Sequence, residues 1–355
     1  MENSNIPSTV QTHALPFEFT GKGSEYFSIW IVNLALTILT LGIYSAWAKV
    51  RRLQYLYRNT SLAGSSFDYH GNPIAILKGR GIAVGALIGV QLALQFAPVA
   101  GLVLLLVLFA VMPWMIKRSL QFRLYNSSYR NLRFGFHGST GGAYRVFLWL
   151  TFAAALIGFL WPYTHHQIKS YQHNNSRYGQ TDFSFSATAG QFYKVYIIAS
   201  LLGLATLLVF GVLVGGAIMQ MVSGGAGVPH GPFASFLGIA IVFLFIAIYQ
   251  AIVGPFVQSR LQNIVWNNTQ LGPHKFVSNI SARKLFVITF TNFILIILTL
   301  GLFKPYAVIR LLRYRMETLA FVPDGSLETF LAGQAQQQSA TGEETAEMFD
   351  VDISF

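Results

Sequence analysis

Residues 39–47 read LTLGIYSAW, and residues 298–306 read LTLGLFKPY. Each phrase ends an apolar run and stands just before a cluster of arginines. A Leu-Gly pair at the end of an apolar helix is a place where the backbone can break and continue in a new direction. The repeat therefore indicates a membrane-embedded building block, which we call an arm, that was copied along the chain.

Composition places the chain in a membrane. It has 355 residues, of which 53% are hydrophobic and 10% are charged, whereas a soluble domain carries about 25% charged residues. Runs of about 20 apolar residues can cross roughly 30 Å of hydrocarbon. Seven such runs lie at 26–46, 80–97, 99–116, 146–163, 193–220, 233–257 and 285–303. We therefore predict an all-α polytopic membrane protein with about seven hydrophobic segments.

Short aromatic phrases separate the apolar runs. They are FEFTG (17–21), FDYHG (67–71) and FGFHG (134–138), with weaker copies in FSFSA (183–187) and FVSN (276–279). Aromatic residues one position apart follow the period of two that is typical of strands, so we predict short extended segments with one apolar face. Asn-polar pairs precede four copies, at 59–60, 126–127, 174–175 and 267–268.

The order of the segments predicts an internal duplication of an arm followed by a helical hairpin. One copy occupies 17–133, a second occupies 134–275, and a final arm with an amphipathic helix occupies 276–322. Residues 1–16 are predicted to be a flexible N-terminus. Residues 323–355 hold seven of the thirteen acidic residues and are predicted to be an acidic disordered tail.

Basic residues beside the arms raise a question of topology. If each arm crossed the bilayer once, successive basic segments would lie on opposite sides, which contradicts the positive-inside rule. Re-entrant arms would keep every basic segment in the cytoplasm, provided that protein buries the broken backbone. The sequence leaves single-spanning and re-entrant arms both open.

Residues at matched places in the arms are candidate ligand contacts. Asn33 and Asn292 lie inside the first and third arms, and Trp47, Tyr163 and Tyr306 follow the breaks. Polar groups inside the membrane are often functional, although hydrogen bonding between helices is the simpler explanation for the asparagines. A second set of candidates for contact with anionic lipid, or for setting topology alone, comprises Arg51, Arg52, Arg118, Arg123, Arg310 and Arg313.

No motif indicates catalysis or metal binding. The chain has no cysteine, no phosphate-binding loop, no HExxH and no nucleophile elbow. The histidine pattern HHxxxxxxH at 165–173 fits no zinc site. We expect no enzyme, no cofactor and no metal. The net charge of +11 is spread beside the apolar runs, so we expect an anionic phospholipid bilayer, and not nucleic acid, as the partner.

The phrase TLGIYSAWAKVRR, together with RNTSLAG and FDYHG, resembles the YjgN family of bacterial inner-membrane proteins, which are built around a domain of unknown function. The resemblance covers about residues 14–320. It implies a multi-pass protein of the inner membrane and carries no established activity. The last arm departs from the pattern, because Pro305-Tyr306 replaces Ala46-Trp47 and Glu317 stands where Arg58 would be.

Two functions are consistent with these features. In the first, the repeated arms enclose a site for the passage or binding of a small solute or lipid, as in transporter folds built from repeats with broken helices. In the second, the protein is structural or regulatory and recruits a protein partner through its basic face and acidic tail. Both are compatible with a homo-oligomer, and the sequence identifies no protein partner.

Overall fold

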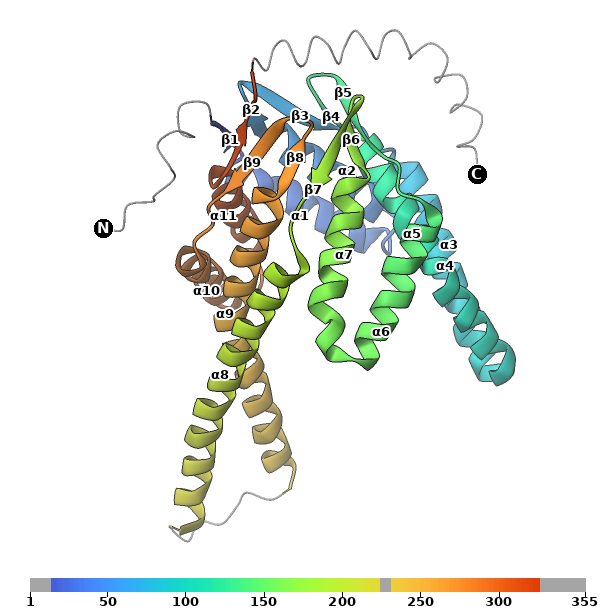
Figure 1. Ribbon diagram of the computed structural model, residues 1–355. Coiled ribbons are helices and arrows are strands. Elements are labelled where there is room, and N and C mark those ends of the chain that lie inside the picture. Colours follow the sequence, from blue (N-terminus) through green and yellow to red (C-terminus); the bar gives the residue numbers. More distant parts are fainter. Residues whose placement is uncertain (1–13, 224–230, 326–355) are drawn as a thin grey trace.

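The computed structural model describes residues 14–223 and 231–325 (Figure 1). Most of the predicted N-terminal segment at 1–16 and of the predicted tail at 323–355 lies outside these ranges. The described part is mostly helical. It also contains a β-barrel at one end, from which the helices extend (Figure 1).

Ten short antiparallel strands close the barrel in the order β1-β10-β9-β8-β7-β6-β5-β4-β3-β2. Each strand has three to five residues, so the barrel is a narrow belt. The strands are β1 (Leu15–Phe19), β2 (Thr60–Leu62), β3 (Ser65–Tyr69), β4 (Ser127–Tyr129), β5 (Leu132–Phe136), β6 (Ser176–Tyr178), β7 (Thr181–Phe185), β8 (Thr269–Leu271), β9 (His274–Ser278) and β10 (Leu319–Val322).

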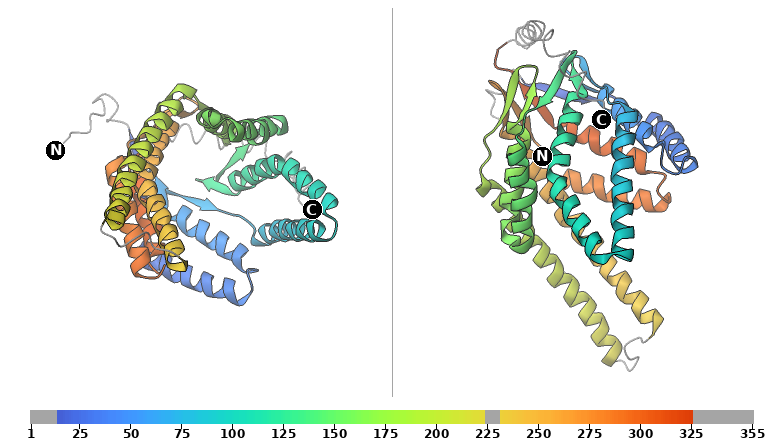
Figure 2. Two further views of the ribbon diagram at one scale, coloured as in Figure 1. Left: turned by 90° about the horizontal axis from the view of Figure 1, so that it is seen from below. Right: turned by 90° about the vertical axis from the view of Figure 1, so that its right-hand side faces the viewer.

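Five helical excursions connect the strands and form a ring around them (Figure 2, left). The arms are α1 (Gly23–Leu39) with α2 (Ser45–Arg58), and α10 (Ala282–Leu298) with α11 (Lys304–Glu317). The long hairpins are α3 (Pro73–Phe96) with α4 (Pro98–Tyr125), and α8 (Ala189–Ser223) with α9 (Pro232–Asn267). The middle arm comprises α5 (Thr140–Tyr144), a π-helical stretch (Arg145–Leu150), α6 (Thr151–Leu156), a 3₁₀ turn (Gly158–Leu160) and α7 (Trp161–Asn174).

The phrase LTLG forms the same tight turn in the first and last arms. Leu41 and Gly42 have φ angles of 50° and 95°, and Leu300 and Gly301 have 49° and 92°, all in the left-handed region where glycine is favoured. The hydroxyl of Thr40 accepts the N–H of residue 44 at 2.9 Å, and the matched hydroxyl at 299 does the same. The turn sends the second helix back along the first.

Each arm therefore returns to the barrel that it left. Strand β1 precedes the first arm and β2 follows it, and the two strands pair with Phe19 opposite Thr60. The last arm likewise leaves from β9 and returns to its neighbour β10. Both ends of each arm lie at one end of the molecule, which favours the re-entrant alternative over a single crossing.

The returning helices α2, α4, α7, α9 and α11 all end in one kind of cap. A side chain in the cap position donates to the backbone carbonyl four residues earlier, at 2.7–2.9 Å. The donors are Asn59, Asn126, Asn175, Asn268 and Thr318. In α2, α4 and α11 the backbone N–H of the cap residue donates to the same carbonyl, so the side chain adds a second hydrogen bond at the end of the helix. Each of the four Asn-polar pairs found in the sequence therefore contains the asparagine that caps the end of a returning helix.

The same cap residues tie together the two ends of each helical excursion. Their backbone carbonyls accept an N–H from the residue just after a long strand, as in His70 to Asn126 at 2.8 Å and His137 to Asn175 at 2.8 Å. The bonds from Thr20 to Asn59 and from Asn279 to Thr318, both 3.0 Å, repeat this contact. Each of the five excursions is therefore closed at its base by one such backbone bond, in addition to the pairing of the two strands that flank it.

The glycine that ends the aromatic phrases is required by close packing. A Cβ atom on Gly71 would lie 2.5 Å from the ring of Tyr69, and one on Gly21 would lie 2.6 Å from the ring of Phe19. Real Cβ atoms do not come this close to other heavy atoms. The second aromatic ring of each phrase folds over the glycine and packs toward the helices.

The mostly helical class with apolar helices is confirmed, but the predicted number of segments is not, and the structure adds a barrel. Within the described ranges, four helices are long and apolar enough to cross a membrane: Pro73–Phe96, Pro98–Tyr125, Ala189–Ser223 and Phe236–Asn267. The prediction of about seven is not confirmed, because α1 and α10 have 17 residues each and the middle arm is interrupted. The all-α class omitted the barrel, because pairing between strands separated by helices depends on backbone bonds that the sequence pattern does not report.

Candidate functional site in the barrel lumen

The long strands each place one phenylalanine in the lumen of the barrel. These residues stand first in the five aromatic phrases, and they are Phe17, Phe67, Phe134, Phe183 and Phe276. Side chains alternate along a strand, so the second aromatic residue of a phrase, two positions further on, shares the face of the first and lies nearer the helices. Phe136, for example, packs against Val146 and Tyr171 of the middle arm.

The short strands supply a second set of lumen residues. They are Leu62, Tyr129, Tyr178, Leu271 and Phe321. Each lies directly opposite a phenylalanine of the first set in the strand register, as with Phe67 and Tyr129. Side chains directly opposite each other are the closest contacts across antiparallel strands. The lumen is therefore lined by five cross-strand pairs, one from each unit.

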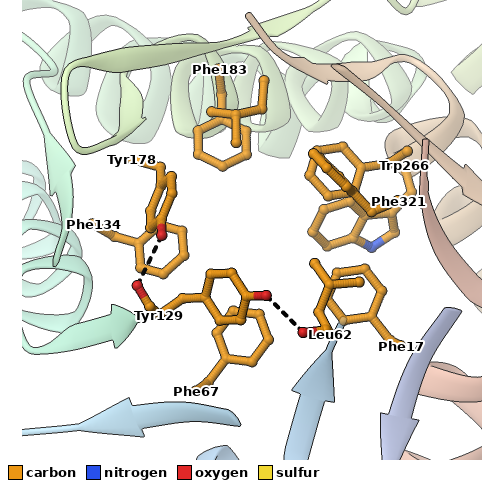
Figure 3. Close-up of a pocket in the computed structure, with 11 residues that line it drawn as sticks. Phe17, Leu62, Phe67, Tyr129, Phe134, Tyr178, Phe183, Trp266 and Phe321 are labelled. Carbon is orange, nitrogen blue, oxygen red and sulfur yellow. Dashed lines mark hydrogen bonds between the residues drawn. The ribbon is translucent and has the colours of Figure 1, made fainter. Parts of the chain in front are cut away.

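These side chains, with Trp266, enclose an apolar cavity of about 140 Å³ (Figure 3). The tyrosine hydroxyls do not add polarity to it. Tyr129 donates to the carbonyl of Leu62 at 2.7 Å, and Tyr178 donates to the carbonyl of Tyr129 at 2.8 Å (Figure 3). Burial raises the pKa of Tyr178, so the phenol stays protonated. A dry apolar cavity of about 150 Å³ can hold a molecule the size of benzene.

The helix side of the cavity is closed by aromatic residues at the helix ends. The ring of Trp266 on α9 lies 5.2 Å from Phe276 and 5.9 Å from His173 on α7. His173 shares a hydrogen bond of 3.1 Å with the hydroxyl of Thr269. Burial, reinforced by the positive charge of Lys169, lowers the pKa of His173 to about 4. The imidazole is therefore neutral at physiological pH.

Comparison with known proteins places the chain in a family. The model of a family described as "Bacterial protein of unknown function (DUF898)" matches residues 14–348. The chain belongs to this family. No solved structure was found to match it.

Two bacterial relatives of this chain are named as inner membrane proteins. The chain is 32% identical over 155 residues to "Inner membrane protein YjgN" of Salmonella typhimurium strain LT2, which covers 43% of the chain and 38% of the relative. It is 34% identical over 143 residues to the Escherichia coli K12 protein of the same name, and this match covers 38% of the chain and 33% of the relative. The chain thus spans well under half the length of these relatives. With the four apolar helices, these relatives confirm the YjgN resemblance and an inner-membrane location.

Neither candidate asparagine of this DUF898 protein lines the cavity. Both are buried. Asn292 joins the two helices of the last arm, because it donates to the carbonyl of Ala307 at 3.2 Å and accepts from Arg310 at 2.7 Å. The side-chain oxygen of Asn33 is buried and has no hydrogen-bond partner in the described ranges. These contacts favour helix packing as the role of Asn292.

The three aromatic candidates lie on three different arms and do not meet. Trp47 stacks on Tyr44, with ring centroids 6.1 Å apart. Tyr306 packs against Phe27 of the first arm at 5.9 Å, and Tyr163 is partly exposed on α7. None of the three lines the cavity. Their role in ligand binding stays a prediction.

The six candidate arginines are divided between α2, α4 and α11. Some bind the protein itself: Arg51 donates to the hydroxyl of Tyr44 at 2.9 Å, and Arg313 donates to the carbonyl of Gly21 at 2.8 Å. Arg118 lies over a tryptophan ring. The described ranges hold two ion pairs, Lys22–Glu25 and Arg58–Asp68. None of the six is therefore neutralised by a described carboxylate, and their contact with lipid stays a prediction.

The lumen residues of the short strands were missed at the sequence level. Their signal is a second phrase that repeats with the first: NTSL at 59–62, NSSY at 126–129, NSRY at 175–178, NTQL at 268–271 and TLAF at 318–321. The first residue is the helix cap and the fourth enters the lumen. A three-residue strand is too short for a period of two to stand out.

Proposed function

We propose that this integral inner-membrane protein binds a small apolar molecule, or the acyl chain of a lipid, in the lumen of its barrel. The observation that carries the proposal is the apolar cavity lined by five cross-strand pairs. Burial of one methylene group there stabilises a complex by about 0.8 kcal/mol. A polar solute would lose its hydration and gain no partner, because the lumen hydroxyls are already bonded to the backbone.

A bound molecule of this class can be detected at Trp266. The test measures quenching of intrinsic fluorescence by dibromostearate in detergent, comparing the protein with Trp266→Phe so that the difference reports the lumen. Trp149, which is 64% exposed on the middle arm, provides a matched control through Trp149→Phe. We expect saturable quenching of the Trp266 component and only linear, micelle-like quenching of the Trp149 component.

A variant that fills the cavity makes the test specific. Leu271→Phe adds volume inside the lumen at a position that lines it and should abolish the saturable phase while leaving the protein folded, which circular dichroism checks. If the Trp266 component is quenched no more than that of Trp149, or if Leu271→Phe binds as well as the wild type, the lumen is not the binding site.

The barrel end of the molecule is proposed to face the cytoplasm. All five excursions leave the barrel and return to it, and the tips at 39–43, 96–99, 156–161 and 298–303 carry no Lys or Arg, with Lys304 directly after the last of them. The positive-inside rule assigns such an end to the cytoplasmic side. This orientation removes the conflict that single-spanning arms create.

The first and last arms are proposed to enter the bilayer without crossing it. Their tips are apolar, and Leu41 and Leu300 are each 94% exposed, which an aqueous environment would not favour. The arm α10–α11 (orange to red) also runs across the direction of the long hairpin α8–α9 (Figure 2, right). A helix in that position lies in the interface and does not span.

The alternative prediction, recruitment of a protein partner, rests on residues that are mostly outside the described ranges. It predicts capture of a partner that depends on 323–355. A non-enzymatic role also stays a prediction.

A further inference from the structure

A second cavity lies outside the barrel, between the middle arm and the long helix α8, which run side by side (Figure 1). Its volume is about 570 Å³, which is in the range of small-molecule sites and roughly four times that of an apolar cavity that holds benzene. Its lining residues are Ala154, Gly158, Phe159, Trp161, Pro162, Tyr193, Tyr196, Ile197, Ser200, Leu201 and Leu204.

A break in the middle arm makes room for this cavity. The first and last arms reverse direction at an LTLG turn, whereas α6 ends at Leu156 and the chain continues through a 3₁₀ turn before α7. A Cβ atom on Gly158 in this turn would meet nothing within 4 Å. The ring of Phe159 reaches across to Tyr193 of α8, with ring centroids 5.0 Å apart. Broken helices of this kind form the ligand sites of many transporters.

The mouth of the cavity faces the bilayer. Helix α8 is long and apolar enough to cross a membrane, and the lining residues Ile197, Leu201 and Leu204 are each more than half exposed. Lys194 is the last charged residue of α8, and Ser200 lies about 9 Å further along the helix at 1.5 Å per residue. A molecule that enters the cavity therefore comes from the lipid phase.

Two hydroxyl groups stand on the wall of the cavity, at Tyr196 and, one helical turn later, at Ser200. Nδ1 of His165 lies 2.8 Å from the Tyr196 hydroxyl and fixes its position. The Ser200 hydroxyl makes no hydrogen bond within the described ranges. A helical hydroxyl can instead donate to a carbonyl one turn earlier, as Thr206 of the same helix does at 2.8 Å. A hydroxyl without a partner in hydrocarbon costs free energy, and a ligand oxygen would remove that cost.

The lining favours a neutral ligand. None of the eleven described residues that line the cavity is charged, so a phosphate group there would lose its hydration and gain no cation. A neutral hydroxyl or carbonyl oxygen can accept a hydrogen bond from Ser200. The apolar residues beyond Ser200 on α8 would then contact a hydrocarbon chain.

We propose that this cavity binds a neutral, membrane-soluble molecule with an apolar chain and a head that carries a hydroxyl or carbonyl oxygen. The head oxygen bonds to Ser200 and lies beside the Tyr196 hydroxyl, and the chain follows Leu201 and Leu204. The site is separate from the barrel lumen, because the two cavities share no lining residue. It does not depend on what the lumen binds.

The test is photolabelling of the full-length protein in phosphatidylcholine nanodiscs. The probe is an analogue of hexadecanol with a diazirine in its chain, and tandem mass spectrometry locates the labelled residues. We expect saturable labelling within 154–162 and 193–204. Labelling of 207–219, which continues α8 away from the cavity, should rise only in proportion to the probe and provides the reference for contact with bulk lipid.

Variants at Ser200 make the test specific. Ser200→Leu removes the hydroxyl and adds volume to the wall, and it should weaken the apparent affinity at least tenfold. Ser200→Ala removes the hydroxyl alone and should weaken it about threefold to tenfold, as expected for one hydrogen bond. Ser200 is exposed, so both variants should fold, which gel filtration and circular dichroism check.

Two control variants separate this site from other effects. Thr206→Val removes a hydroxyl from the same helix, outside the lining and already bonded to a backbone carbonyl, and should change the affinity less than twofold. Leu271→Phe fills the barrel lumen and should leave labelling of 154–162 and 193–204 unchanged. Failure of this site and failure of lumen binding are therefore distinguishable.

Competition with unlabelled molecules identifies the head group. Competition by hexadecanol alone assigns a hydroxyl head, and competition by decylubiquinone, alone or with hexadecanol, assigns a class that includes ring carbonyls. The proposal is overturned if neither molecule competes, or if phosphatidylglycerol competes as well as they do. It is also overturned if labelling within 154–162 and 193–204 does not saturate, or if Ser200→Leu is labelled like Thr206→Val.

Discussion

Gly138→Ala tests the packing that fixes the aromatic phrases against the helices. A Cβ atom at this position would lie 2.5 Å from the Phe136 ring and 2.5 Å from the hydroxyl oxygen of Tyr171. Neither neighbour can yield freely, because both are buried in one cluster and Tyr171 donates to the carbonyl of Ser139 at 2.9 Å. Overpacking of this kind costs about 1–3 kcal/mol, and we expect Gly138→Ala to lower the free energy of unfolding by about this amount.

The control lies three residues away. A Cβ atom on Gly141 meets nothing within 4 Å, and Gly141 is in α5, where alanine is favoured over glycine by roughly 0.5–1 kcal/mol. Thermal unfolding in detergent should therefore shift in opposite directions for Gly138→Ala and Gly141→Ala. Phe136→Leu in the Gly138→Ala background should recover part of the loss. Equal stability of the two alanine variants would refute the packing argument.

Three further predictions follow from named contacts. His173 has a pKa of about 4 in the folded protein, below its value near 6.5 in the unfolded chain, so the unfolded state binds more protons between these two pH values. Stability should therefore fall as the pH falls from 6.5 to 4. His173→Gln should make this fall, measured by thermal unfolding, less steep. Asn33→Leu should leave stability unchanged or raise it, since the side-chain oxygen of Asn33 is buried without a hydrogen-bond partner in the described ranges. Asn292→Leu should lower the free energy of unfolding by about 1–2 kcal/mol in the same thermal assay, because two hydrogen bonds are lost. The opposite order would contradict the packing role of Asn292. Because the chain has no cysteine, Ser65→Cys near the barrel and Ala97→Cys at a hairpin tip should react with an impermeant thiol reagent from opposite faces of membrane vesicles, and labelling of both from one face would exclude the proposed orientation.

The sequence predicted the repeated parts well where side chains alone determine them. The LTLG turn, the extended aromatic phrases and the apolar hairpins each depend on local residue type. A Leu-Gly pair can adopt left-handed φ angles, and Phe-x-Phe can only present its rings to one face of a strand. These features were visible because neighbours in the chain produce them.

The barrel was not predictable in the same way. Phe17 and Leu62 face each other although an entire arm lies between them in the chain, and Phe67 and Tyr129 do so across a long hairpin. Register between such segments is set by backbone hydrogen bonds and helix caps. The candidates Asn33, Asn292 and Trp47 were all chosen from the arms, because polar and aromatic residues are conspicuous in and beside apolar runs. A lumen residue such as Leu62 cannot be told from an ordinary core residue in the sequence.

Among the strand pairs that no tight turn connects, the pair with the fewest register pairs lies where the two ends of the described chain meet. β1 and β10 share only two register pairs, Leu15 with Phe321 and Pro16 with Ala320, and proline has no N–H to donate. Strand pairing alone cannot hold this seam closed. The adjoining arms supply the rest, because Phe19 and Tyr26 of the first unit pack with Ile309 of α11, and Arg313 donates across the seam to the carbonyl of Gly21 at 2.8 Å. Packing between the first and last arms therefore adds to strand pairing in closing the ring at this seam.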